Sequence, residues 1–90
     1  MGERPAIVIA THRETDMYVV IPMTAQRDAN RFPNTYEVQT SVRNRLDTDS
    51  VALIFQIRCL CRERFLRRIG TLDTEDHDNI CHLVRNFLHL

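Results

Sequence analysis

The sequence predicts a small α+β fold, in which a bent antiparallel sheet or partly open barrel of about five strands precedes one C-terminal helix. The chain has 90 residues, of which 43% are hydrophobic and 27% charged, so we expect one globular domain over residues 1–90. Five short apolar or β-branched segments are separated by polar turns. These turns are too short for crossover helices, so most of the strands must pair antiparallel.

Each predicted strand is marked by its composition. Two segments are apolar enough to be buried, the third alternates like a half-exposed strand, the fourth is the longest and the fifth is closed by Gly70. Pro22 falls near the end of the second strand, where a missing backbone donor is tolerated. The predicted strands are Ala6–Thr11, Tyr18–Met23, Tyr36–Thr40, Val51–Arg58 and Phe65–Ile69.

The last segment changes to a helical period. Asp73 is suited to cap a helix, and Glu75, Asp76 and Asp78 follow it with negative charge where a helix N-terminus favours it. Apolar residues then recur at helical spacing and predict a stripe that packs on the sheet. This stripe consists of Ile80, Leu83, Val84, Phe87 and Leu88.

The charges are balanced in total but unevenly placed. Twelve arginines and no lysine face twelve acidic residues, which excludes a histone-like protein that binds nucleic acid by bulk charge. Residues 43–72 nevertheless hold seven arginines against three acids, and residues 73–90 hold one against four. This basic group is either a solvated face or a track for an RNA backbone. It consists of Arg43, Arg45, Arg58, Arg62, Arg64, Arg67 and Arg68.

Cysteine usage and hydropathy favour a cytoplasmic protein with reduced thiols. The three cysteines are an odd number, the N-terminus does not read as a signal peptide, and the longest apolar runs have five residues. Cys59 and Cys61 share one face of a strand and could join His77, Cys81 or His82 in a zinc site. Paired Cys-x-x-Cys spacing is absent, so we expect buried thiols, no metal and no cofactor.

The register of the first hairpin brings two polar residues together. If Thr11 pairs with Met17, paired residue numbers add to 28, and Arg4 lies directly across from Thr24, with Cβ atoms roughly 5 Å apart. A guanidinium beside a hydroxyl at a strand end can bind a phosphate, although such a pair is also common on a solvated sheet. A slip by one residue would place the two side chains on opposite faces.

An ordered set of short motifs resembles the MazF/PemK-type toxins of toxin–antitoxin systems. Arg4-Pro5 opens the first apolar strand, and Ile21-Pro22-Met23-Thr24 ends the second, as the family's Arg-Pro and Pro-x-Thr do. The match continues over nearly all 90 residues in the family's order. The further motifs are Phe32-Pro33 before Tyr36-Glu37-Val38, Asp49-Ser50-Val51-Ala52-Leu53, Gln56-Ile57-Arg58, and Arg64-Phe65 through Ile69-Gly70-Thr71-Leu72.

The resemblance implies an SH3-like barrel that forms a homodimer. It also implies a metal-independent, sequence-selective endoribonuclease that cleaves single-stranded RNA (an mRNA interferase) and is restrained by an antitoxin protein. Arg4 and Thr24 match the family's catalytic Arg and Thr. Together with the basic middle of the chain, the resemblance favours Arg43, Arg45, Gln56 and Arg58 as RNA-binding residues.

The implied reaction is attack of a ribose 2′-OH on the adjacent phosphate, which yields a 2′,3′-cyclic phosphate and a 5′-OH. A positioned Arg fork and a hydroxyl can stabilise the charge that gathers on the phosphate oxygens without a metal. Because an Arg stays protonated at ordinary pH, we assign Arg4 electrostatic stabilisation, with protonation of the leaving group as a second role left open. The sequence does not identify a general base.

Two departures from the family pattern support a rival interpretation. Only three residues precede Arg4, where the family has a further strand and a Gly-rich loop, so we expect an open sheet edge. Phe55 and Ala25 stand where many members have Asp and Ser. The rival is an inactive module that binds RNA or the antitoxin. A third interpretation is a gyrase-directed CcdB-like toxin, against which the Arg-Pro and Pro-x-Thr motifs speak.

Overall fold

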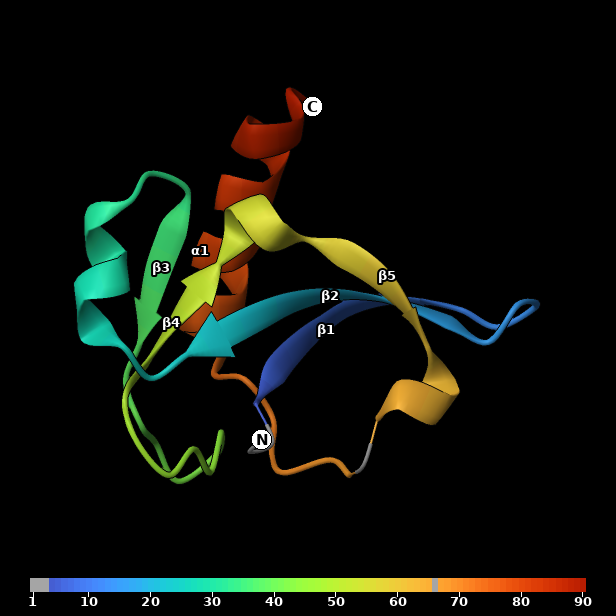
Figure 1. The fold of residues 1–90 in the computed structure, drawn as a ribbon, viewed down its shortest axis with the longest axis horizontal. Helices are drawn as coiled ribbons and strands as arrows, with labels where there is room; N and C mark the ends of the chain where they lie inside the picture. Colours follow the sequence, from blue (N-terminus) through green and yellow to red (C-terminus); the bar gives the residue numbers. More distant parts are fainter. Residues whose placement is uncertain (1–3, 66) are drawn as a thin grey trace.

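The computed structural model describes residues 4–65 and 67–90 and confirms the α+β class. The sheet is antiparallel and bent, with the order β1-β2-β4-β3 and β5 as an additional partner of β2 (Figure 1). In the described residues β1 and β3 do not pair with each other, so the sheet does not close. The elements are β1 (Ala6–His12), β2 (Met17–Thr24), the 3-10 helix η1 (Arg27–Arg31), β3 (Thr35–Val38), β4 (Ser50–Leu53), η2 (Ile54–Gln56), β5 (Arg58–Cys61), η3 (Arg62–Arg64) and α1 (Thr74–Leu88).

The hairpin of β1 and β2 changes register once. Near the turn His12 pairs with Met17, so the predicted pairing of Thr11 with Met17 is wrong by one residue. A β-bulge at Ile9 absorbs the extra residue, and from Val8 to the start of β1 the paired residue numbers add to 28. The open end of the hairpin therefore has the predicted register, although its turn does not.

The long strand predicted over Val51–Arg58 is interrupted. Both of its parts pair with β2, but paired residue numbers add to 75 for Ala52 with Met23 and to 78 for Arg58 with Val20. The β4–β5 segment therefore contains three more residues than the stretch of β2 that it pairs with. Three residues is also the length of η2. The segment turns away from β2 for three residues and then resumes pairing as β5.

Pro22 explains where this interruption falls. The Met23 N–H points toward the β1 side, because it donates to the Pro5 carbonyl oxygen at 3.1 Å. Backbone groups alternate along a strand, so the nitrogen of Pro22 faces the side of β4 and β5. Proline has no N–H to donate there, and the ladder on that side is broken opposite it.

Two other strand predictions differ from the structure. Strand β3 ends at Val38, because residues 39–49 form a loop built on side-chain hydrogen bonds. The predicted strand Phe65–Ile69 is wrong for its described part, since Phe65 and residues 67–69 belong to no strand, and Leu66 lies outside the described residues. Gly70 and its neighbours pack on the 39–49 loop instead of pairing with a strand.

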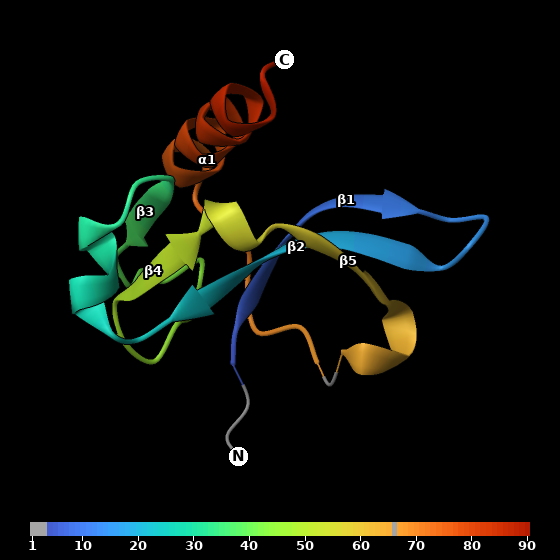
Figure 2. The same cartoon turned by 45° about the horizontal axis from the view of Figure 1, so that its top comes forward.

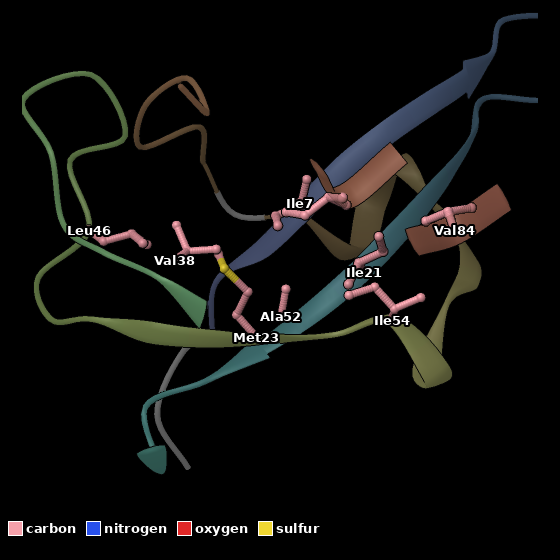
Figure 3. Close-up of a cluster of buried hydrophobic side chains, with 9 residues drawn as sticks. Ile7, Ile21, Met23, Val38, Leu46, Ala52, Ile54 and Val84 are labelled. Atoms are coloured by element: carbon pink, nitrogen blue, oxygen red, sulfur yellow. The ribbon is translucent and has the colours of Figure 1, made fainter. Parts of the chain in front are cut away.

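The hydrophobic core lies between α1 and one face of the sheet. Ile21 and Met23 face it from β2, and Ile80 and Val84 from the helix, at 1% and 9% exposure for the helix residues (Figure 3). Asp73 is the N-cap residue as predicted, although its side chain makes no capping hydrogen bond. Leu83 and Phe87 pack against the same cluster.

Leu88 is the exception to the predicted apolar stripe. It is 45% exposed, because the last turn of α1 extends past the sheet before the left-handed residue His89 ends the helix (Figure 2). The opposite face of the sheet is covered in part by η1, whose Arg27 and Asn30 side chains donate to the Glu37 carboxylate at 3.1 and 3.0 Å.

Candidate functional site

Arg4 and Thr24 follow directly on the last backbone hydrogen bond of the hairpin. That bond joins Pro5 and Met23, whose residue numbers add to 28, so the next pair along the same register is Arg4 and Thr24. Arg4 is exposed. Thr24 is half-buried, and its Oγ1 accepts a hydrogen bond from the Gln26 N–H at 3.2 Å.

Alternation along β2 sets which face these residues occupy. Ile21 and Met23 face the core, so Thr24 and Val20 belong to the opposite face. Arg58 pairs with Val20 and shares that face. It lies four β2 residues from Thr24, or roughly 13 Å along the strand.

Gln56 lies apart from this register. It is exposed within η2, the turn that leaves the ladder and packs against α1 (Figure 1). Its neighbour Phe55 is 40% exposed. The structure therefore does not place Gln56 and the Arg43–Arg45 loop in one cluster.

The loop of residues 39–49 is organised by the buried side chain of Asn44. Its Oδ1 accepts from the Ser41 and Leu46 N–H groups, each at 3.0 Å, and its Nδ2 donates to the Gln39 carbonyl at 2.8 Å. At the loop's outer part, the Asp49 carboxylate accepts from the Thr40 N–H at 2.8 Å. These bonds hold the loop in one conformation.

This fixed loop presents Arg43 and Arg45 to solvent. Arg45 has a φ of 56°, in the left-handed region. Within residues 4–65 and 67–90, the other non-glycine residues with positive φ are Asp16, Asn34 and His89, the types that tolerate this region best. An Arg there is held by its surroundings, and its backbone N–H donates to the Ser41 carbonyl at 3.1 Å.

Residues 68–71 complete a basic pocket with this loop. A Cβ on Gly70 would lie 2.7 Å from the Arg43 carbonyl oxygen and closer still to that of Asn44, so only glycine allows this approach. The Thr71 N–H donates to the same Arg43 oxygen at 2.9 Å. The resulting open pocket, of about 340 Å³, is lined by Arg43, Arg45, Arg68, Ile69, Gly70 and Thr71.

Sequence reasoning does not single out Arg68, Gly70 or Asn44 as site residues. Arg68 enters only as one member of the basic group, because it falls within a predicted strand. Gly70 is the one sequence feature that could have pointed to the pocket. From the sequence pattern alone, however, it indicates the end of a strand and not a close approach between two segments. Asn44 gives no signal that distinguishes it from an ordinary loop asparagine.

An acidic groove lies on the other side of the 39–49 loop. The Tyr36 hydroxyl donates to Asp76 Oδ1 at 2.6 Å and accepts from Asn79 Nδ2 at 3.1 Å. Burial, and then the hydrogen bond to Asp76, raise the pKa of Tyr36. The groove, of about 430 Å³, is lined by Tyr36, Glu37, Gln39, Thr40, Ser41, Asp73, Glu75 and Asp76.

The cysteines and histidines do not assemble a metal centre in the part of the chain that is described. Cys59 and Cys61 lie on β5 and Cys81 on α1, all three as free thiols, and Cys59 is exposed, contrary to the prediction of buried thiols. His77 lies 3.7 Å from the Cys81 sulfur on the helix surface. Residues 4–65 and 67–90 contain no group of three or more ligand side chains that could hold an ion.

Comparison with known proteins identifies the family. Among the described residues, no helix is long and apolar enough to cross a membrane. No curated protein matches the sequence. Residues 1–88 match the family described as PemK-like, MazF-like toxin of type II toxin-antitoxin system. This match spans nearly the whole chain and agrees with the antiparallel sheet and terminal helix, and the chain therefore belongs to the PemK-like, MazF-like toxins of type II toxin–antitoxin systems.

Proposed function

We propose that the chain is a metal-independent, sequence-selective endoribonuclease that cleaves single-stranded RNA in the cytoplasm and is inhibited by a cognate antitoxin. The proposal treats residues 1–90 as one catalytic domain that works as a homodimer. Membership of the family supports the general activity. The observation that carries the proposal is the hydrogen bond between Met23 and Pro5, which continues the register in which Arg4 and Thr24 are neighbours.

The proposed mechanism uses the two side chains for charge stabilisation. The guanidinium of Arg4 binds the scissile phosphate through its planar fork of donors. The Thr24 hydroxyl donates a second hydrogen bond to a phosphate oxygen, while its own oxygen still accepts from the Gln26 N–H. Both interactions strengthen as the 2′-OH attacks, because negative charge gathers on the phosphate oxygens in the transition state.

Exposed arginines near this pair supply the attraction for the RNA backbone. Arg58 and Thr24 share the face of the sheet that points away from the α1 core, and Arg43 and Arg45 are exposed on the ordered loop. A net charge of zero leaves binding dependent on such local clusters. Gln56 contributes a neutral donor and acceptor suited to a base edge, on the η2 side of the molecule.

The test is cleavage of a single-stranded RNA in EDTA by the wild type and by Arg4→Ala, Thr24→Val and Arg13→Ala. We expect the Arg4 change to lower kcat by about 10²–10³-fold, as for loss of a transition-state donor. Arg13 is also exposed, lies in the turn between β1 and β2 at the opposite end of the hairpin, and should be dispensable. Cleavage that survives Arg4→Ala at the wild-type rate would overturn the catalytic assignment.

A binding module without catalysis is the second candidate, favoured by the exposed Phe55 beside Gln56. It predicts an RNA or antitoxin complex with no cleavage products from any variant. Intact RNA together with a folded wild-type protein that binds it would select this candidate.

A further inference from the structure

We propose that the pocket of Arg43, Arg45 and Arg68 is a phosphate-binding subsite for the RNA strand, separate from the phosphate that reacts at Arg4 and Thr24. This inference rests on the proposed function for the identity of its ligand. The pocket itself is defined by the two segments 43–45 and 68–71.

In the described part of the chain, none of the three guanidinium groups is neutralised by an ion pair. Among the described residues, no carboxylate lies within ion-pair distance of Arg43, Arg45 or Arg68, whereas Arg27 is paired with Glu37 at 3.1 Å. Three like charges around one pocket repel each other, and an anion between them removes this repulsion. An oxyanion with several acceptor oxygens fits the planar donor forks of arginine.

The pocket is also positioned before any ligand arrives. Arg68 donates from Nε to the Gly70 carbonyl at 3.3 Å and from Nη2 to Thr71 Oγ1 at 2.5 Å, so its side chain is directed by its own segment. The Asn44 bonds fix the opposite wall, and Gly70 lets the walls meet. Little ordering is therefore required on binding, which favours affinity.

Its place in the fold suits an extended strand of RNA. In both views the loop of residues 39–49 and the segment 67–72 lie at the end of the molecule where β1 begins (Figures 1 and 2). Arg4 lies two residues before the start of β1. The pocket and the Arg4–Thr24 pair thus lie at the same end of the molecule, as contact of both with one RNA strand requires. The volume of about 340 Å³ lies in the range of small ligand sites.

Binding of a 2′-O-methyl RNA oligonucleotide, which cannot be cleaved by 2′-OH attack, tests this subsite without catalysis. Affinity is measured by fluorescence anisotropy at several salt concentrations for the wild type, Arg43→Ala/Arg68→Ala and the control Arg13→Ala. We expect about tenfold weaker binding by the double variant. The slope of log K against log salt should fall in magnitude by about 0.7 for each phosphate that the variant no longer neutralises. The control should match the wild type.

Wild-type affinity and slope in the double variant would overturn the subsite, as would an equal loss in Arg13→Ala. Circular dichroism and the melting temperature of each variant establish that it is folded. Arg68→Lys provides a second variant that retains the charge but loses the fork, and we expect a smaller loss of affinity with an unchanged salt slope. Full wild-type affinity in Arg68→Lys and in the double variant would refute the role of Arg68.

The source of the anion is tested with two further probes. Inorganic phosphate should shift the amide NMR signals of Gly70 and Thr71 and compete with the oligonucleotide. If phosphate binds in the pocket but the substitutions leave the affinity for the oligonucleotide unchanged, the assignment of the pocket to RNA is wrong. Polyglutamate serves as a model of an acidic protein. If the double variant loses affinity for polyglutamate but not for RNA, the pocket binds an acidic protein and its assignment to RNA is wrong.

Failure of the subsite and failure of the proposed function give different results. If the wild type cleaves RNA and the double variant binds and cleaves like it, the subsite is wrong and the function stands. If no cleavage occurs but the double variant loses affinity, the function is wrong and the subsite stands. With both correct, the double variant has a raised KM for a long RNA and a nearly unchanged kcat.

Discussion

The basic pocket and the acidic groove lie on either side of the same loop and differ in how their charges are satisfied. In the groove, Asp76 accepts from Tyr36, and Glu37 accepts from Arg27 and Asn30. In the pocket, Arg43 and Arg45 have no ion-pair partner among the residues that the structure describes. Two of the four acids that line the groove, Glu37 and Asp76, are bonded within the fold, whereas the exposed side chains of Arg43 and Arg45 are the ones that the proposed subsite uses. A chain with zero net charge thus separates an acidic cluster that is partly bonded within the fold from the basic cluster that we propose to bind RNA.

The largest expected effect comes from Asn44→Ala, because Asn44 supports both regions through the loop between them. Its loss leaves the N–H groups of Ser41 and Leu46 and the Gln39 carbonyl without their partner. We expect the free energy of unfolding, measured by urea titration, to fall by about 2–4 kcal/mol. RNA affinity should fall as well, since Arg43 and Arg45 flank this residue.

The matched control is Asn86→Ala, an exposed asparagine on α1 whose side chain lies 3.4 Å from His82. It should change stability by less than about 0.5 kcal/mol. An Asn44 variant as stable as this control would show that the loop does not depend on that side chain.

Gly70→Ala addresses the pocket alone. The added methyl would meet the carbonyl oxygens of Asn44 and Arg43, which are backbone atoms with little freedom to move. We expect a loss of about 1–3 kcal/mol in thermal or urea unfolding, together with weaker oligonucleotide binding. Val42→Ala, at a side chain of the same loop that is 97% exposed, adds no atom at this contact and serves as the control. If both variants are equally stable, the two segments do not meet as closely as the structure has them.

Tyr36→Phe addresses the groove alone and has the smallest expected effect. It removes the hydrogen bonds to Asp76 and Asn79 and should cost about 0.5–1.5 kcal/mol near neutral pH. Binding of RNA should remain at the wild-type level. Tyr18→Phe is the matched control, because Tyr18 packs by its ring on Phe65.

The contribution of Tyr36 should depend on pH in a defined direction. Its pKa in the folded state is raised above the ordinary value of 10.0, so folding favours the protonated phenol. This stabilisation is fully present below pH 10 and is lost as the pH rises through the folded-state pKa. The stability difference between the wild type and Tyr36→Phe should therefore shrink in alkaline solution. A constant difference up to the alkaline limit of folding would contradict the network.

Local pattern predicts the fold well where strands are continuous and less well where they bend. The predicted register at Arg4 and Thr24 holds only because two departures cancel: the turn is one residue off, and the bulge at Ile9, which the pattern does not predict, makes up the difference. The interruption at η2 has no local signal, because Ile54 and Phe55 are as apolar as their strand neighbours. Only the pairing of both parts with β2 reveals it.

The site is less predictable because it depends on contacts between segments distant in sequence. Arg43 and Arg45 can be nominated from local charge and family resemblance. Arg68 joins them through the approach of Gly70 to Asn44, which spans 26 residues and leaves no periodic signal. The separation of Gln56 from the loop likewise follows from the turn at η2 and cannot be seen in a linear motif.

The most direct test of the central claim is to identify the ends of the RNA products made by the wild-type protein in EDTA. We expect a 2′,3′-cyclic phosphate on one fragment and a 5′-OH on the other, with no cleavage where the scissile nucleotide carries a 2′-deoxy sugar. Products ending in 3′-OH and 5′-phosphate, cleavage that persists at the deoxy position, or intact RNA with folded protein would contradict it.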